Sequence, residues 1–197
     1  MSKGDRTRNS ILSHATELAS QVGLSGLTIG SLAEELELSK SGLFAHFRSK
    51  EALQVQVLEH AGADFAERVV APSLKEPRGE PRVRALFERW LAWGLDAGLP
   101  GGCVFVAAAI ELDDQPGPAR DCLVALQRQW FGVLSLSFKK GIEAGHFDRR
   151  SDPDQFAQDL YGIMLGCHHQ FRLMQDPEAE ARARRAFERL LDNSRTR

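Results

Sequence analysis

The stretch from Thr28 to Glu51 constrains the fold more than any other part of the chain, because it reads as two short helices around a tight turn. Thr28 can cap the first helix through its hydroxyl, and Ser39 can cap the second, which spans residues 40–47. Two short helices joined in this way form a helix-turn-helix, here over about residues 29–48. Such motifs place their second helix in the major groove of DNA.

The second helix of this motif is the predicted reading helix. Leu43 and Phe47 lie four residues apart and face inward, so they anchor the helix, and Leu38 is expected to fill the inside of the turn before it. The residues left on its surface are Lys40, Ser41, Gly42, Phe44 and His46. Gly42 costs a helix about 1 kcal/mol relative to alanine. It permits either a close approach to the DNA backbone or tight packing against the preceding helix.

Longer helices flank the motif. Apolar residues at helical spacing predict a helix over about residues 6–22, and Gly23 follows it as a natural left-handed stop. The chain restarts near Lys50 as a long helix with an apolar stripe of Leu53, Val57, Ala61 and Phe65. The first amides of this helix and the Lys50 ammonium suit a phosphate group. The predicted DNA-contacting residues are Thr28, Ser39, Lys40, Ser41, Gly42, Phe44, His46 and Lys50.

The run from Ile11 to Leu53 resembles the N-terminal domain of TetR-family transcriptional regulators. Members of this family end the reading helix with an aromatic-rich YxxF-like segment before SKE, and this chain has FAHFRSKE over residues 44–51. Phe44 departs from the pattern, since the family usually places there a tyrosine whose hydroxyl contacts a phosphate. The domains that the resemblance implies are a DNA-binding domain over residues 1–50, a linking helix over 51–71, and a ligand-binding and dimerisation domain over 72–197.

The resemblance also implies how such a protein acts. Two subunits would pair their last two helices into a four-helix bundle, and the long apolar faces at the end of this chain agree with that, since they must be buried somewhere. The two reading helices would then meet a pseudo-palindromic operator in double-stranded DNA. A small-molecule effector in the second domain would change their separation and release the DNA. We therefore expect a dimeric repressor that is not an enzyme and needs no cofactor or metal.

At 197 residues the chain is long enough for a second domain with its own core. Its apolar residues keep helical spacing without strand alternation, so the sequence predicts an all-α fold of about nine helices. Prolines and glycines from Pro72 to Pro81 mark a connection after the linking helix, and a later helix should stop near Gly98. Residues 130–138 are apolar nearly all round, so their helix is expected in the interior.

The candidates for an effector pocket are Trp90, Cys103, Phe105, Trp130, Phe131, His168 and Phe171. The aromatic residues favour an apolar or aromatic ligand contacted by few polar groups, although each of them can equally fill a core. His168 and the adjacent His169 cannot both face one cavity from a helix, and a surface position is the alternative for either. Glu111 lies near the end of an otherwise apolar helix. An exposed helix end is enough to explain a carboxylate at this position, so we assign it no role.

Cys103 supports a different hypothesis. It follows two glycines at a predicted helix start, where the helix dipole favours a thiolate that reacts with oxidants and electrophiles. A thiol-based electrophile or redox sensor is therefore an alternative to a ligand sensor, and a buried structural cysteine is the alternative to both. An enzyme with Cys103 as nucleophile and His168 or His169 as base would lack an oxyanion-hole motif, a phosphate loop and a metal-ligand cluster. A ligand-independent DNA-binding or interaction module, whose second domain only dimerises, stays open.

Composition sets the remaining expectations. The net charge of −2 gives no global basic footprint, so the DNA prediction depends on where individual charges lie. The three cysteines lack the paired short spacings of a zinc site or a disulfide framework, which indicates reduced thiols. Apolar runs fall short of the roughly 18 residues of a membrane span, and the N-terminus has no hydrophobic signal core. A cytoplasmic protein without a membrane partner is expected.

Overall fold

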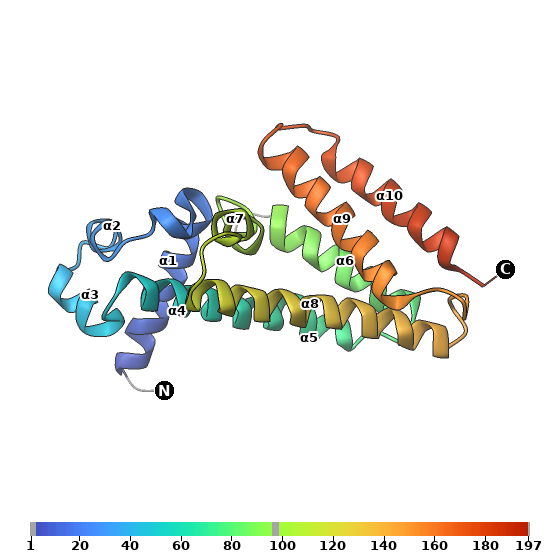
Figure 1. Cartoon of the computed structure of the whole chain (residues 1–197), viewed down its shortest axis with the longest axis horizontal. Helices are drawn as coiled ribbons and strands as arrows, with labels where there is room; N and C mark the ends of the chain where they lie inside the picture. Colours follow the sequence, from blue (N-terminus) through green and yellow to red (C-terminus); the bar gives the residue numbers. More distant parts are fainter. Residues whose placement is uncertain (1–2, 96–98, 197) are drawn as a thin grey trace. The chain divides into compact units, whose positions relative to one another are not determined.

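The structure is a computed structural model that describes residues 3–95 and 99–196 (Figure 1), so the predicted stop at Gly98 lies outside the described residues. Regular structure in these ranges is helical, apart from one isolated antiparallel bridge between Phe147 and Arg195. The elements are α1 (Lys3–Gly26), α2 (Ile29–Glu35), α3 (Lys40–Phe47), α4 (Lys50–Phe65), the π-helical turn η1 (Ala66–Val70), α5 (Ala71–Leu74), α6 (Glu80–Leu95), α7 (Val104–Leu112), α8 (Pro118–Glu143), α9 (Pro153–Arg172) and α10 (Ala179–Ser194). Because α4, η1 and α5 run on without a break, the described residues form nine helices, and the all-α prediction is confirmed.

The linking helix continues further than predicted. The sequence places a connection from residue 72 onwards, but α5 carries Pro72 inside the helix and the connection spans only residues 75–79. Directly before Pro72, the amide of Ala71 bonds to the carbonyl of Ala66, five residues back, instead of the usual four. Proline has no N–H and crowds the carbonyl four residues before it, so a wide turn at this point lets the helix pass through it.

The chain divides into two compact units. The first comprises the described residues up to Asp64 together with residues 99–126, and the second comprises residues 65–95 and 127–196. The sequence-based division at residue 72 assigns residues 99–126 to the second domain. In the structure these residues, which include α7, cluster with the N-terminal helices.

The first unit closes around apolar side chains from α1 to α4. The buried residues of this core include Ile11, Leu12, Ala15, Ala19, Leu32, Leu43, Phe47, Leu53 and Val57. Full burial of one leucine or phenylalanine side chain contributes about 2 kcal/mol. Helices as short as α2 and α3 are marginal alone in water, so this packing is what keeps them folded.

The second unit is held by two groups of stacked aromatic rings. Phe87 of α6 stacks on Phe187 of α10, with ring centroids 4.1 Å apart. Phe138 stacks on Phe147 at 4.4 Å and on Phe156 at 3.9 Å. These rings are buried, and they join α6 to α10 and α8 to α9.

The apolar face of α10 is filled within the subunit. Ala183, Phe187 and Leu191 are buried by the same chain, and α9 and α10 lie side by side (Figure 1). From the sequence, we expect a partner subunit to cover this apolar face. In the structure, the face packs against other helices of the same subunit. What α10 leaves exposed is largely charged.

The helix α8 is not interior on all sides, contrary to the prediction. Trp130, Leu134 and Phe138 are buried, but Leu136 is 55% exposed and Gly132 is also exposed. The helix is therefore apolar on a face that the second unit does not cover. Among the helices of the described ranges, none combines the length and apolar content that a membrane span requires.

Glu80 joins the start of α6 to the end of the chain. Its carboxylate accepts two hydrogen bonds from Arg195, at 2.6 and 2.9 Å, and one from Arg84 at 2.8 Å. The pKa of Glu80 is lowered to about 2, mainly by the hydrogen bonds from Arg195 and further by the bond from Arg84. A carboxyl group whose pKa falls on folding adds stability above its unfolded pKa, and this stability is lost as pH falls toward the folded pKa.

Glu80→Gln is therefore expected to lower the free energy of unfolding by about 2 kcal/mol at pH 7. The gap from the parent protein should close as pH falls from about 4.5 to about 2, where Glu80 becomes protonated. Urea denaturation across this pH range measures it. Glu180→Gln removes a half-exposed partner of Arg184 and should cost well under 1 kcal/mol. Equal losses in both variants, or a gap that persists at pH 2, would contradict the assignment.

Candidate nucleic-acid interface

The first helix of the motif is fixed by a reciprocal cap. The amide of Ser31 donates to Thr28 Oγ1 over 2.9 Å, and the amide of Thr28 donates to Ser31 Oγ over 3.0 Å. This capping box satisfies two backbone donors that a helix start would otherwise leave open. Thr28 is thus the predicted cap of α2, whereas Ser31 was not anticipated. A DNA contact by the Thr28 hydroxyl, which the cap already uses, stays a prediction.

The reading helix α3 begins as predicted at Ser39, whose Oγ accepts the amide of Gly42 over 3.1 Å. Leu43 and Phe47 are fully buried and anchor the helix. Leu38 does not fill the turn, because it is 45% exposed. The turn is instead closed by the backbone, through a 2.9 Å bond from the amide of Leu38 to the carbonyl of Ala33.

The outer surface of α3 is open. Lys40, Ser41, Gly42, Phe44 and His46 are all exposed, and the Phe44 ring is 57% exposed. A side chain at Gly42 would meet only Ser39 Oγ of its own cap, so tight packing against α2 does not explain this glycine. Lys40 Nζ lies 3.7 Å from Glu34, but both side chains are largely in solvent, where such a pair holds weakly. The cation remains available to a stronger anion.

Lys50 has a partner inside the protein. Its Nζ donates to the carbonyl of Ser25 over 2.6 Å, and Gln54 Nε2 donates to the carbonyl of Leu24 over 2.7 Å. The first turns of α4 therefore hold the carbonyl groups at the end of α1. A phosphate contact by Lys50 stays a prediction, and this second role was not anticipated from the sequence.

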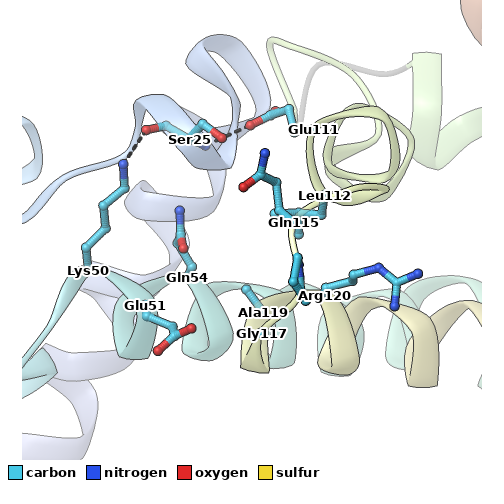
Figure 2. A pocket seen from close by; sticks show the side chains of 11 residues that line it. Ser25, Lys50, Glu51, Gln54, Glu111, Leu112, Gln115, Gly117, Ala119 and Arg120 are labelled. Atoms are coloured by element: carbon cyan, nitrogen blue, oxygen red, sulfur yellow. Dashed lines mark hydrogen bonds between the residues drawn. The ribbon is translucent and has the colours of Figure 1, made fainter.

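Glu111 holds the same two residues from the other side, which corrects its interpretation as an unassigned exposed helix end. Leu24 and Ser25 donate their amides to Glu111 Oε1 and Oε2, at 3.2 and 2.7 Å. Figure 2 shows Lys50 and Glu111 reaching Ser25 from opposite sides. The sequence signal was a single carboxylate on an otherwise apolar helix, combined with the glycine that interrupts α1.

A polar pocket of about 380 Å³ lies beside these contacts (Figure 2). It is lined by Ser25, Lys50, Glu51, Gln54, Glu111, Leu112, Gln115, Pro116, Gly117, Ala119 and Arg120. The amide groups of Gln54 and Gln115 face the Ser25 and Glu111 side of the pocket. The seven predicted effector residues lie elsewhere, and this lining is far more polar than an apolar ligand needs.

The two parts of this architecture match known family models. Residues 11–57 match the model described as bacterial regulatory proteins, tetR family, and residues 79–187 match the one described as tetracyclin repressor-like, C-terminal domain. The chain belongs to the TetR family. Its helix-turn-helix is therefore the DNA-binding element of a transcriptional regulator, and such regulators are generally not enzymes.

Two named relatives of this TetR-family protein are transcriptional repressors. NemR of Escherichia coli is 28% identical over 169 residues, which cover 85% of this chain and 84% of NemR. DhaR of a Mycobacterium species is 27% identical over 164 residues, 81% of each chain. A TetR regulator from Chloroflexus aurantiacus superposes with a TM-score of 0.85 at 24% identity, covering 98% of this chain and 96% of the other. The reduced form of E. coli NemR gives 0.79 at 25% identity, covering 95% and 96%.

The predicted effector residues of this TetR-family chain fall in both units. Cys103 and Phe105 belong to the first unit, and the others belong to the second. The buried ones are Trp90, Cys103, Phe105, Trp130 and His168, while Phe131 is partly buried and Phe171 is 37% exposed. His169 is exposed, in agreement with the expectation that at most one of the paired histidines is enclosed. Burial, followed by the charge of Arg172, lowers the pKa of His168.

Trp130 has an unusual environment. Its ring meets Phe65 edge to face at 5.0 Å, and Phe65 meets Trp93 in the same way at 5.3 Å. The Trp130 indole N–H is buried and finds no acceptor among the described residues. A buried donor without an acceptor costs about 1–3 kcal/mol, so it marks a place where a bound molecule can supply one.

The cysteines differ in environment. Cys103 is the N-cap residue of α7 and only 2% exposed. Burial, with a contribution from Glu59, raises the pKa of the Cys122 thiol, and burial raises the pKa of Cys167 to about 11. Neither Cys122 nor Cys167 is therefore inclined to form a thiolate. Cys103 lies at a helix start, which favours a thiolate, but it lacks the exposure to solvent that a reactive thiolate needs.

Proposed function

We propose that this TetR-family protein is a dimeric repressor that leaves a pseudo-palindromic operator when a small apolar or aromatic effector binds. The observation that carries the proposal is the open outer face of α3, on a helix otherwise anchored by buried residues. A helix that reads DNA must present hydrogen-bond donors and small residues to the base edges while the core of its own domain stays folded. Lys40, Ser41 and Gly42 at the start of α3 meet this requirement, and His46 lies one turn beyond Gly42.

Lys40→Ala is expected to weaken operator binding five- to tenfold and to reduce the slope of log affinity against log salt by about one, if Lys40 contacts a phosphate. If it reads a guanine edge instead, the preference at one base position should relax. Fluorescence anisotropy at several salt concentrations separates these outcomes. Lys75→Ala removes an exposed cation of the second unit and should change neither quantity. Wild-type affinity and slope in Lys40→Ala would remove this residue from the interface.

We propose that the pairing surface centres on α9. A bundle that includes both of the last two helices stays a prediction for α10, whose apolar face is filled within the subunit. On α9, Leu165 and Phe171 are exposed, and side chains added at Gly162 or Gly166 would meet nothing within 4 Å. Small residues on an apolar helix face let a second helix approach closely, as a four-helix bundle requires.

The effector proposal rests on Trp130. An aromatic or apolar molecule that offers one acceptor could satisfy its indole N–H and pack against the surrounding rings. Such sites are mostly apolar, with a few polar groups that fix the orientation of the ligand. Release of DNA then requires that the effector bind more tightly to the DNA-free state.

The experiment that tests the function is selection of bound sequences from a random pool of double-stranded DNA at fixed salt. A recovered motif with two-fold symmetry would support a dimeric specific regulator and provide a probe for ligand screening. If no molecule in an aromatic library releases that probe, the ligand-independent module becomes the better account. If no sequence is enriched, specific regulation by the free protein is wrong.

A thiol-based repressor is the second candidate, and the position of Cys103 at the start of α7 favours it. Because the residue is 2% exposed, an adduct there would displace the start of α7. Mass spectrometry after mild treatment with an electrophile tests this candidate. An adduct at Cys103 with loss of DNA binding would support it, and an unmodified Cys103 under conditions that modify the more exposed Cys122 would exclude it.

A further inference from the structure

The end of α1 is held from outside by a segment that follows it by some 80 residues in the sequence. Gly23 has φ 78°, a conformation that interrupts the helix inside α1 just before Leu24 and Ser25. The Glu111 carboxylate takes the amides of Leu24 and Ser25, one on each oxygen. It lies so close to Gly23 that any side chain there would collide with it. Hydrogen bonds to a charged acceptor are about twice as strong as neutral ones.

A second contact fixes the same segment further up α1. The amide of Gly101 donates to Ser20 Oγ over 2.9 Å in a buried position. A Cβ at Gly101 would overlap the carbonyl group of Ser20, so the two backbones are in direct contact. We call residues 101–112, which begin with Gly101 and end with α7, the anchor segment.

The contacts of the anchor segment continue toward the reading helix. Leu24 and Ser25 are bonded through their amides to Glu111 and through their carbonyls to Gln54 and Lys50 of α4. Lys50 begins α4, two residues after the end of the motif at Arg48. Two consecutive residues, Leu24 and Ser25, therefore connect the anchor segment directly to the helix that follows α3.

We propose that Glu111 is a positioning residue for DNA binding, which fixes the end of α1 and the start of α4 and so the placement of α3. The proposal rests on the proposed function, because it concerns the affinity of the same DNA-binding motif. Without the carboxylate, the motif samples more arrangements, and the apparent affinity falls by the fraction that is no longer competent to bind. Glu111 touches no DNA in this proposal. A change that displaces α7 would act through it.

The test is Glu111→Gln, which keeps the shape of the side chain but offers one acceptor to two amides. Binding of the selected operator is expected to weaken about tenfold, with an unchanged salt slope. The sign is diagnostic, because loss of a negative charge by simple electrostatics would strengthen DNA binding. Asp114→Asn, two residues past α7 at an exposed position, removes the same charge and should bind as tightly as the parent or slightly more tightly.

Amide hydrogen exchange separates the parts of the proposal. In Glu111→Gln, the amides of Leu24 and Ser25 should exchange faster, while core amides of α4 keep their protection. Faster exchange at these amides with unchanged operator affinity would overturn the positioning role. Unchanged exchange would overturn the anchor itself. If the parent protein selects no DNA sequence, the proposed function fails, and the exchange measurement still decides whether Glu111 anchors α1.

Discussion

Replacing Gly101 with alanine is expected to destabilise the first unit by about 3 kcal/mol or more, one of the larger effects a single methyl group can have. The added carbon would overlap the carbonyl group of Ser20, which belongs to the backbone of α1 and cannot rotate away. To relieve the overlap, the chain must separate from α1, and the buried bond from the Gly101 amide to Ser20 Oγ is then lost. Thermal and urea unfolding measure the change.

Gly30→Ala provides the matched control for this prediction. Gly30 lies in α2 of the same unit, and a side chain there meets Thr28 Oγ1 at 3.6 Å and Lys40 Cε at 3.8 Å, which are ordinary contacts. Alanine in a helix is better than glycine by about 0.5–1 kcal/mol, so this variant should be slightly more stable than the parent. Similar stabilities for the two variants would show that residue 101 does not pack against α1 as described.

Gly166→Arg is expected to convert the proposed dimer into monomers and to weaken operator binding at least a hundredfold. The arginine would place a charge and a long side chain on the face of α9 where a second helix must approach closely. A monomer can hold only one half-site, so it loses the gain in affinity that two linked contacts provide. Sedimentation velocity and anisotropy with the selected DNA measure the two effects.

Asn193→Arg adds the same charge at an exposed position near the end of α10 and should leave both properties unchanged. If Gly166→Arg stays dimeric, the pairing surface lies elsewhere. If it becomes monomeric but binds the full operator as tightly as the parent, the dimer is not what gives the affinity. Circular dichroism of the isolated variants checks that both remain folded.

Much of the fold could be predicted because it depends on local patterns. The spacing of Leu53, Val57, Ala61 and Phe65 predicts one buried helix face, and all four residues are buried. The caps at Thr28 and Ser39 depend on bonds to residues three positions on, so the sequence alone determined where α2 and α3 begin. The start of α2 and both ends of α3 were therefore placed within one or two residues, whereas α2 ends earlier than the three turns that its apolar spacing predicts.

The contacts that were missed join residues far apart in the sequence. Glu111 reaches Leu24 and Ser25 across more than 80 positions, and no local pattern records such a pair. Similarly, the sequence predicts the apolar face of α10. It does not determine whether a partner subunit or the chain's own α6 and α9 cover that face. Leu38 was misplaced because its surroundings depend on how the turn closes, which its apolar character does not determine.

The long helix from α4 to α5 has a row of buried residues at every fourth position, at Leu53, Val57, Ala61, Phe65, Val69 and Ser73. At 3.6 residues per turn, such a row rotates around a regular α-helix by about 40° at every step. The π turn at η1 uses more residues for one revolution, so the row rotates less where it passes through this turn. Phe65, Val69 and Ser73, which all belong to the second unit, therefore stay closer to one edge of their helix than a regular α-helix would hold them. A single extra residue in one turn thus keeps one helix edge directed at one core.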